Sequence, residues 1–346
     1  MQPSKHTALI LKDWNYTVGE IETPVPGKGE LLIKVQTAAL NPADWKIPKY
    51  KLERLVKLPA ILGSDIAGDV EKVGEGVSGF EVGDRVFCTG ENWKDRGGYQ
   101  QYVLIKADII EKIPDNLSYD EAATLPLAIA TAYSGLYAQL PHGIGLVAPA
   151  NKDGYKKYTE IPIVIIGGAS AVGQAVIQLA KLSGFSPIIT TASLANEEVL
   201  KGIGATHVLD RNLPPAAAVA TITTIAAKPI LHVYDAICSG STQQLAMDIL
   251  SDEGRAAFPT PIITAKSSKK VYTAQVFAAA RAPFNYEIFK ELYHEKLYGW
   301  LEKGLIVPNR YEVLPGGLKG VEGGLKRLEA DAISRLKLLV HPQETA

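Results

Sequence analysis

Ile163-Val-Ile-Ile-Gly-Gly-Ala-Ser-Ala-Val-Gly-Gln-Ala-Val-Ile-Gln-Leu-Ala-Lys181 is a β-branched run, then a turn of small residues, then an amphipathic helical pattern. Gly168, Ser170 and Gly173 occupy the three positions of G-x-G-x-x-G, with serine in the middle. The first position makes the tight turn, the second lets backbone approach a pyrophosphate, and the third lets helix pack on strand. Serine is small enough for that approach and has a hydroxyl that can donate to phosphate. The stretch predicts a dinucleotide-binding βαβ unit, although a glycine-rich turn without a ligand has the same residue types.

Helix and strand patterns alternate around this stretch from about Tyr119 onward, which is typical of a parallel sheet. The first 120 residues instead contain short β-rich runs separated by Gly and Pro. We therefore predict an α/β protein with a Rossmann doubly wound parallel sheet over residues 123–283 and a mostly β domain formed by residues 1–122 and 284–346. The expected helices cover residues 119–139, 173–183, 197–203, 286–303 and 317–330, the later strands cover 163–166, 187–191, 207–209, 309–314 and 336–340, and a long surface connection covers 141–160.

The second predicted strand of the parallel sheet carries the signal for the form of the cofactor. It ends at Ser193, and no Asp or Glu occurs from Gly173 to Asn196. An acidic residue near this point would hold the ribose 2′-hydroxyl of NAD and repel a 2′-phosphate, so its absence favours NADPH. Ser193 and Asn196 can hydrogen-bond the phosphate, and Arg211 can pair with it. Lys201 is a rival for that role, but its place within a helix favours a solvated surface lysine.

Composition narrows the class of partner. The 346 residues include 36 basic and 37 acidic side chains, mixed along the chain, for a net charge of −1. This pattern predicts no nucleic-acid or membrane partner and favours a small, largely uncharged substrate. No run is long and apolar enough for a signal peptide or membrane helix, and the two cysteines, Cys88 and Cys238, lie far apart. We expect a cytoplasmic protein without a disulfide framework.

Seven further motifs follow one another along the chain: Ala39-Leu-Asn-Pro-Ala-Asp-Trp-Lys46, Leu62-Gly-Ser-Asp-Ile-Ala-Gly68, Val73-Gly-Glu-Gly-Val77, Phe80-Glu-Val-Gly-Asp-Arg-Val86, Gly97-Gly-Tyr-Gln-Gln-Tyr102, Ala122-Ala-Thr-Leu-Pro126 and Leu200-Lys-Gly-Ile-Gly-Ala205. Through these motifs the chain resembles the medium-chain dehydrogenase/reductase superfamily from end to end. That resemblance implies a GroES-like fold for the mostly β catalytic domain and a monomer or homodimer.

The chain differs from the zinc-dependent alcohol dehydrogenases of that superfamily at the positions of the metal-binding motifs. Those enzymes carry a cysteine where this chain has Leu40 or Asn41, and Gly-His-Glu where it has Gly63-Ser64-Asp65. The four closely spaced cysteines of their structural zinc lobe have no counterpart, since Cys88 stands alone. We therefore expect no metal. The expected chemistry shifts from alcohol oxidation to reduction of substrates already activated for hydride addition.

Within the superfamily the chain looks most like the quinone reductase and fungal trans-acting enoyl reductase branch. The resemblance implies that Asn41 to Trp45 lie beside the nicotinamide, that Thr131 bonds its carboxamide, and that Ala169 to Val172 hold the pyrophosphate. By position, the cofactor is also expected near Ile237, Phe258, Leu339 and Val340. The full set of expected cofactor-binding residues is Asn41, Pro42, Asp44, Trp45, Thr131, Gly168, Ala169, Ser170, Ala171, Val172, Gly173, Ser193, Asn196, Arg211, Ile237, Phe258, Leu339 and Val340.

These expectations lead to a reaction hypothesis: hydride passes from NADPH to the β-carbon of an enone, enal or enoyl thioester, and a proton follows at the α-carbon. Lys46 is the candidate residue for stabilising the carbonyl charge electrostatically or for donating the proton. The alternative is that Lys46 is a solvated lysine at the edge of a strand. Asp44 is expected to cap a turn or helix start, and Tyr99 and Tyr102 to pack in the core. The alternatives are an NADPH quinone oxidoreductase, a small-ketone reductase, a trans-acting partner of a polyketide synthase, and a non-catalytic binding protein.

Overall fold

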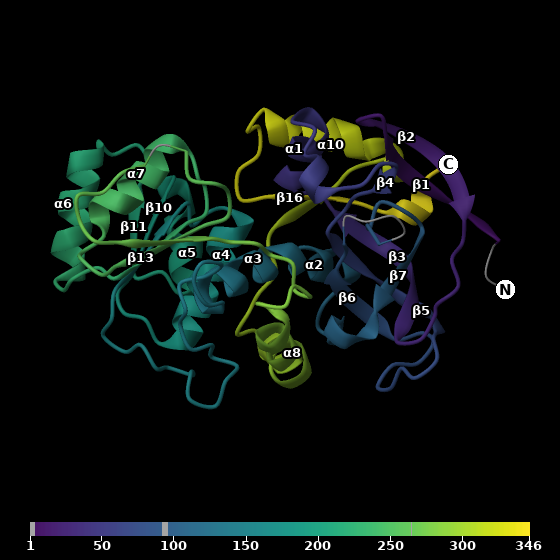
Figure 1. The fold of residues 1–346 in the computed structure, drawn as a ribbon, viewed down its shortest axis with the longest axis horizontal. Helices are drawn as coiled ribbons and strands as arrows, with labels where there is room; N and C mark the ends of the chain where they lie inside the picture. The colour runs from purple at the N-terminus through teal and green to yellow at the C-terminus, as the bar shows by residue number, and fades with distance from the viewer. Residues whose placement is uncertain (1–3, 92–95, 264) are drawn as a thin grey trace. The chain divides into compact units, whose positions relative to one another are not determined.

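The computed structural model describes residues 4–91, 96–263 and 265–346, and these form two compact units (Figure 1). The first unit combines the chain up to Leu127 with Pro308–Ala346, and the second is Ala128–Val307. A mostly β unit and a parallel-sheet unit confirm the predicted fold class. The boundaries differ from the predicted ones at two places: residues 123–127 belong to the first unit, and residues 284–307 belong to the parallel-sheet unit.

Side-chain contacts of this segment explain the difference. The buried Asn285 amide donates to the carbonyls of Phe277 and Ala279 (2.8 and 3.0 Å) and accepts from the Ser134 hydroxyl (2.9 Å). The ring of Phe289, which is fully buried, lies edge-on to Tyr133 at 5.5 Å. Residues 284–307 therefore pack in the second unit, because burying the apolar ring and satisfying the amide there stabilises the fold. The last strands, although they follow closely in sequence, return to the first unit.

The second unit is built on a six-stranded, fully parallel sheet in the order β11-β10-β9-β12-β13-β14. In chain order this is 3-2-1-4-5-6, the doubly wound arrangement in which the order reverses between the first and fourth strands. Ligands bind such sheets at the carboxyl ends of the strands beside that reversal. The strands are β9 (Ile163–Ile166), β10 (Ile188–Ala192), β11 (His207–Asp210), β12 (His232–Asp235), β13 (Arg255–Phe258) and β14 (Tyr272–Gln275).

Helices α4 to α7 alternate with these strands and lie alongside the sheet (Figure 1). Helix α4 begins after Ser170, whose side chain caps it, and ends at Gly184, whose φ of +89° suits glycine. No helix in the described part of the chain is long and apolar enough to cross a membrane. The helices of this unit are α3 (Pro126–Tyr137, which begins in the first unit), α4 (Ala171–Ser183), α5 (Glu197–Ile203), α6 (Pro215–Ala226), α7 (Gly240–Ile249), α8 (Tyr286–Glu295) and α9 (Leu297–Glu302).

Two of the predicted helices are each divided in the structure. The helix expected over residues 119–139 is α2 (Tyr119–Ala123) followed by α3, because Pro126 lacks an N–H and disfavours helical backbone in the residue before it. The helix expected over 286–303 is α8 and α9, separated at Lys296, where φ is −132°. The prediction of single long helices was wrong at both places.

The long connection over residues 141–160 has no helix or strand, as predicted. Tyr158 ties its end to the second unit. The Tyr158 ring stacks on Phe185 at 4.7 Å, its hydroxyl accepts from the Val147 N–H at 2.7 Å, and its own N–H donates to the Ser183 carbonyl at 2.9 Å. The connection is therefore a packed part of the second unit.

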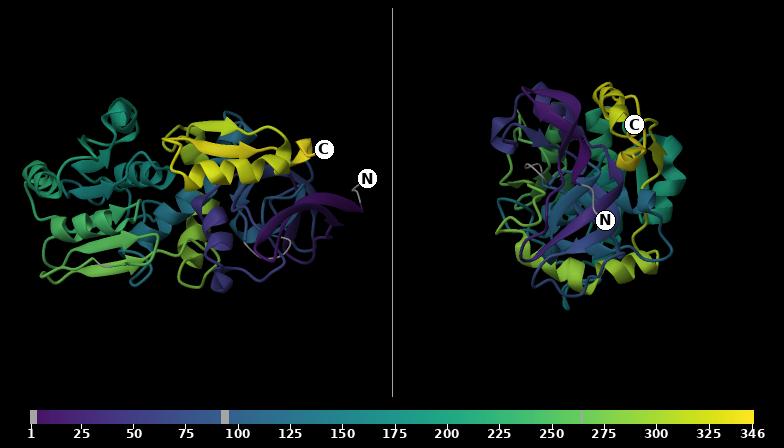
Figure 2. Two further views of the ribbon diagram at one scale, coloured as in Figure 1. Left: turned by 90° about the horizontal axis from the view of Figure 1, so that it is seen from above. Right: turned by 90° about the vertical axis from the view of Figure 1, so that its right-hand side faces the viewer.

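The first unit has a three-stranded sheet, β2-β1-β4, and a seven-stranded sheet, β15-β16-β3-β5-β6-β8, in which β7 also pairs with β3. The C-terminal residues 311–340, yellow in Figure 2, supply β15 and β16, with α10 beside them. Helix α1 packs on α10. The elements are β1 (Lys5–Lys12), β2 (Asn15–Glu22), β3 (Glu30–Ala39), α1 (Pro42–Lys49), β4 (Ala60–Ile61), β5 (Asp65–Val73), β6 (Arg85–Thr89), β7 (Tyr102–Lys106), β8 (Glu111–Lys112), α2, β15 (Tyr311–Val313), α10 (Val321–Glu329) and β16 (Lys337–Val340).

Candidate functional site

The turn between β9 and α4 has the tight packing that the glycine pattern predicts, with one correction. The residue with left-handed backbone is Gly167, at φ +84°, rather than Gly168. A Cβ on Gly168 would lie 2.2 Å from Thr190 Oγ1, and one on Gly173 would lie 2.2 Å from the Gly167 carbonyl oxygen. Gly168 therefore allows the turn to approach β10, and Gly173 allows the helix to approach the turn.

Ser170 caps α4 instead of presenting a free hydroxyl. Its Oγ accepts from the Gly173 N–H and donates to the Gly167 carbonyl, both at 2.9 Å. The expectation that this hydroxyl donates to phosphate does not hold in this geometry, because its single proton is already used. The first N–H groups of a helix, here from Ala171 and Val172, have no partner within the helix and face its N-terminal end. With the helix dipole they fit an anionic pyrophosphate.

The residues predicted for the 2′-phosphate follow two adjacent strands. Ala192 of β10 pairs with Asp210 of β11, so Ser193 and Arg211 come directly after paired positions at the carboxyl edge of the sheet. Arg211 is exposed, and Ser193 and Asn196 are half-buried. Their placement suits binding of a phosphate at this edge.

Lys201, the rival cation, lies within α5. Its ammonium pairs with the Glu197 carboxylate one turn earlier, at 2.7 Å. Both side chains are largely exposed, so this is an ordinary surface ion pair of the i,i+4 type. The structure thus supports the interpretation of Lys201 as a solvated surface lysine.

Thr131 is held beside the sheet by its backbone. Its carbonyl accepts from the buried Tyr234 hydroxyl at 2.8 Å, and Tyr234 lies on β12, next to β9. Gly135, one turn later, has no room for a Cβ, which would lie 2.5 Å from the Tyr234 ring. Helix α3 is therefore fixed against β12, and the side chain of Thr131, 8% exposed, lies within the same unit as the turn after β9.

Asp235 at the end of β12 is a residue that the sequence reasoning missed. It pairs with Ile166 at the end of β9, and its fully buried carboxylate accepts from the N–H groups of Ile237 and Cys238 at 2.9 and 3.0 Å. Burial raises the pKa of Asp235. The loop held in this way carries Ile237, whose side chain is 2.4 Å from where a Cβ on Gly167 would lie.

Exposure to solvent separates the four residues expected near the cofactor by position. Ile237 is 50% exposed, unlike Phe258, Leu339 and Val340. All three are fully buried, Phe258 in the core of the second unit and Val340 in that of the first. Cofactor contact through the side chains of Phe258 and Val340 is therefore not supported, because both are used for packing.

In the first unit, Asn41 precedes α1, and Pro42 to Trp45 form the first turn of that helix. The Asp44 carboxylate accepts from the Asn41 N–H at 2.8 Å and from the Tyr99 hydroxyl at 2.6 Å, so Asp44 caps the helix as predicted. Tyr99 is fully buried and Tyr102 is 8% exposed, which confirms their expected packing roles. Burial outweighs these hydrogen bonds and raises the pKa of Asp44 to about 6.

Lys46 lies on α1, which corrects the strand-edge alternative. It is half-buried, and its ammonium lies 5.5 Å from the centroid of the Trp45 ring. Lys49, one turn later, is exposed and pairs with Glu329. Pro42 is exposed at the first position of the helix.

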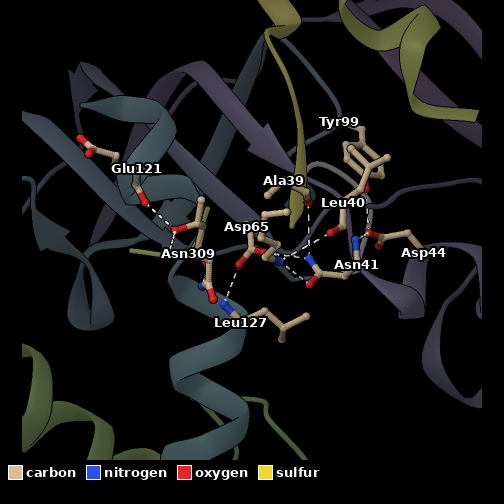
Figure 3. Close-up of polar contacts among 11 residues, drawn as sticks. Ala39, Leu40, Asn41, Asp44, Asp65, Tyr99, Glu121, Leu127 and Asn309 are labelled. Atoms are coloured by element: carbon tan, nitrogen blue, oxygen red, sulfur yellow. Dashed lines mark hydrogen bonds and ion pairs between the residues drawn. The ribbon is translucent and has the colours of Figure 1, made fainter. Parts of the chain in front are cut away.

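A buried cluster joins Asn41, Asp65 and Lys337, and the first two lie in the segments where the sequence departs from the zinc-dependent enzymes (Figure 3). The Lys337 ammonium donates to Asp65 Oδ2 at 2.5 Å and to Asn41 Oδ1 at 2.7 Å, and the Asn41 amide donates to the same Asp65 oxygen at 2.8 Å. The other Asp65 oxygen accepts from the Leu127 N–H at 2.6 Å. Asp65 and Lys337 were not among the predicted site residues.

This cluster does not fit zinc. Zinc sites use thiolates, imidazoles and carboxylates, whereas the donors here are one amide and one carboxylate that already bind an ammonium. Across the described ranges, no group of three His, Cys, Asp or Glu side chains is arranged to hold a metal ion. The signal for Lys337 was present in the sequence: a lysine within the apolar run Leu336 to Val340 of a predicted strand.

Comparisons with known proteins agree with this architecture. Residues 27–115 match the alcohol dehydrogenase GroES-like domain, and residues 171–260 match the family described as zinc-binding dehydrogenase. Trans-enoyl reductase himH of Aspergillus japonicus is 31% identical over 323 residues, 90% of this chain and 89% of that protein. Trans-enoyl reductase resD of Aspergillus sclerotiorum is 33% identical over 341 residues, 91% and 94% of the two chains.

Two solved structures share the fold. An alcohol dehydrogenase superfamily protein from Novosphingobium aromaticivorans superimposes with a TM-score of 0.80 at 23% identity, covering 97% of this chain and 99% of that one. A mycobacterial protein complexed with NADPH gives 0.75 at 22% identity, covering 97% and 100%. The chain belongs to the medium-chain dehydrogenase/reductase superfamily. It is an oxidoreductase of that family with a doubly wound parallel sheet, and relatives of similar length carry the name trans-enoyl reductase.

Proposed function

We propose that this protein is an NADPH-dependent reductase of carbon–carbon double bonds conjugated to a carbonyl. The observation that carries the cofactor choice is the end of β10, which has no carboxylate, next to Arg211 at the end of β11. A carboxylate there would repel a 2′-phosphate, whereas a guanidinium attracts it. The name trans-enoyl reductase, which several relatives carry, supports a conjugated double bond as the acceptor.

In this proposal the second unit holds the cofactor. The N-terminal end of α4 receives the pyrophosphate, and Ser193, Asn196 and Arg211 receive the 2′-phosphate. Thr131 bonds the carboxamide of the nicotinamide, at a position that the Tyr234 hydrogen bond to its carbonyl fixes. The bound NADPH supplies the hydride.

The first unit is proposed to align the acceptor and to supply the proton. The start of α1, from Asn41 to Trp45, borders the nicotinamide, and Asp44 keeps that turn in one conformation. Hydride adds to the β-carbon of the acceptor, and the negative charge that develops on the carbonyl oxygen requires a nearby positive group. Lys46 is our candidate for stabilising that charge and for donating the proton that reaches the α-carbon.

The test is a cofactor-oxidation screen with the purified protein. Enones, enals and enoyl thioesters are compared with quinones and simple ketones, each with NADPH and NADH, and the product is identified by mass. We expect the highest kcat/KM with NADPH and a conjugated carbonyl, and a gain of two mass units in the acceptor. Faster turnover of quinones would favour the quinone oxidoreductase alternative, and no turnover of any acceptor despite NADPH binding would favour a binding protein.

Lys46→Met tests the proton donor, with Lys49→Met as the control on the same helix. Loss of a general acid typically costs about a hundredfold or more in rate, so K46M is expected to lower kcat by that factor while K49M has little effect. Equal effects of the two substitutions would remove Lys46 from the mechanism.

A further inference from the structure

Lys337 is a buried lysine in a strand of the first unit. Its side chain is 6% exposed, and that of its partner Asp65 has no exposed surface. The ammonium has three acceptors: the Asp65 carboxylate, the Asn41 side-chain oxygen and, at 3.5 Å, the Leu40 carbonyl. An ammonium has three donors, so this arrangement uses the whole hydrogen-bonding capacity of the group.

Burial of such a pair gives little net stability. Taking both charges out of water costs several kcal/mol per ion, and well-packed apolar residues often replace a buried pair without loss. The need to stabilise the fold is therefore a weak explanation for a charge at this position. The geometry of the acceptors is more informative, because they come from distant parts of the chain: Lys337 is 296 residues from Asn41 and 272 from Asp65.

The cluster reaches both segments that the proposed reaction depends on. Asn41 is the residue before α1 and starts the turn proposed to border the nicotinamide, and Lys337 and Asp65 together bind both ends of its side-chain amide. The second Asp65 oxygen binds the N–H of Leu127 in the first turn of α3, the helix whose next turn carries Thr131. The Asp65 carboxylate thus contacts both the Asn41 side chain and the beginning of α3 (Figure 3). The Lys337 ammonium holds that carboxylate and the Asn41 side-chain oxygen.

We propose that Lys337 is a positioning residue for hydride transfer: its ammonium, bound between Asp65 and Asn41, fixes the turn that precedes α1 in the conformation needed beside the nicotinamide. This inference rests on the proposed function. Misplacing a reacting group by about 1 Å can cost about a hundredfold in rate, so such a tie matters more for turnover than for affinity.

The experiment compares three variants of the full chain. Lys337→Met removes the charge, and Lys337→Met with Asp65→Asn removes both charges, so that no unpaired ion stays buried if the single variant fails to fold. Lys112→Met is the matched control, because Lys112 pairs with Asp84 at 2.8 Å in the same unit but is 40% exposed. The measurements are NADPH affinity, kcat normalised to NADPH-binding sites, and amide hydrogen exchange of the peptide that covers residues 40–47.

We expect the double variant to bind NADPH within about threefold of the wild type, because the second unit holds the phosphates, and to lose about tenfold or more in kcat. Hydrogen exchange is expected to rise in residues 40–47 and to stay unchanged in β1 and β2, while K112M behaves as the wild type throughout. Unchanged exchange at residues 40–47, or a rise spread evenly over the first unit, would overturn the positioning role. If the wild type turns over no acceptor, the proposed function fails, and the exchange measurement still decides whether Lys337 orders the turn.

Discussion

Arg211→Ala tests the choice of NADPH over NADH directly. Arg211 is exposed and directly follows Asp210 of β11, which pairs with Ala192 at the end of β10. A hydrogen bond to a charged group contributes about 1.5–3 kcal/mol, and exposure to solvent favours the lower end of that range. About 1.4 kcal/mol corresponds to a factor of ten, so the NADPH dissociation constant is expected to rise about tenfold. NADH has no 2′-phosphate, and its dissociation constant should stay within about twofold of the wild-type value.

Fluorescence titration of both cofactors, at low and at high salt, provides the measurement. Salt screens an exposed charge pair, so the difference between wild type and R211A should shrink as the salt concentration rises. Lys201→Ala is the control, because Lys201 already pairs with Glu197 at 2.7 Å, and its NADPH affinity should match that of the wild type. Equal weakening of NADH and NADPH in R211A, or a larger effect in K201A, would refute the assignment of the 2′-phosphate to Arg211.

Two further predictions concern the turn after β9 and the C-terminal segment. Gly173→Ala places a Cβ 2.2 Å from a backbone carbonyl oxygen, so it should lower the free energy of unfolding by about 1–3 kcal/mol and weaken the binding of NADPH and NADH. Gly202→Ala, where a Cβ has open space, should have neither effect. Urea unfolding and cofactor titration that fail to separate the two variants would contradict this prediction. Burial disfavours the charged ring of His341, but hydrogen bonds to Glu344 and Asp120 outweigh burial and raise the pKa of His341. The stabilisation of the folded state by the protonated ring is therefore complete below the ordinary pKa of about 6.5 and is lost as pH rises through the raised pKa. Urea unfolding across that pH range should show the loss in the wild type, and an equal loss in His341→Gln would exclude His341 as its source.

The strand, turn and helix from Ile163 to Ser183 could be predicted well because their signals are local. A β-branched strand, small residues in a turn and a helical period lie within about twenty consecutive positions, and each acts on its own neighbourhood. The same holds for α5, whose predicted limits, Glu197–Ile203, are those observed. The sequence predicted that the Ser170 hydroxyl could donate to phosphate, whereas in the structure it caps α4. The sequence allows both roles, and only the hydrogen-bond partners distinguish them.

The membership of residues 284–307 in the second unit followed from contacts that the amphipathic pattern does not encode. The pattern shows that one face of α8 is apolar, but it does not say which surface will cover that face. The packing of Phe289 against Tyr133 and the hydrogen bonds of Asn285 settle that question in three dimensions.

Local order along the chain was therefore enough to establish the parallel-sheet fold, the glycine-rich turn proposed to bind phosphate, and the lack of Asp or Glu from Gly173 to Asn196. The cluster of Asn41, Asp65 and Lys337 required the tertiary structure. Its members come from segments up to 296 residues apart, and they meet because β16 pairs with β3 and β3 pairs with β5. A lysine in an apolar strand signals an unusual site, but only strand pairing determines which carboxylate and which amide neutralise it.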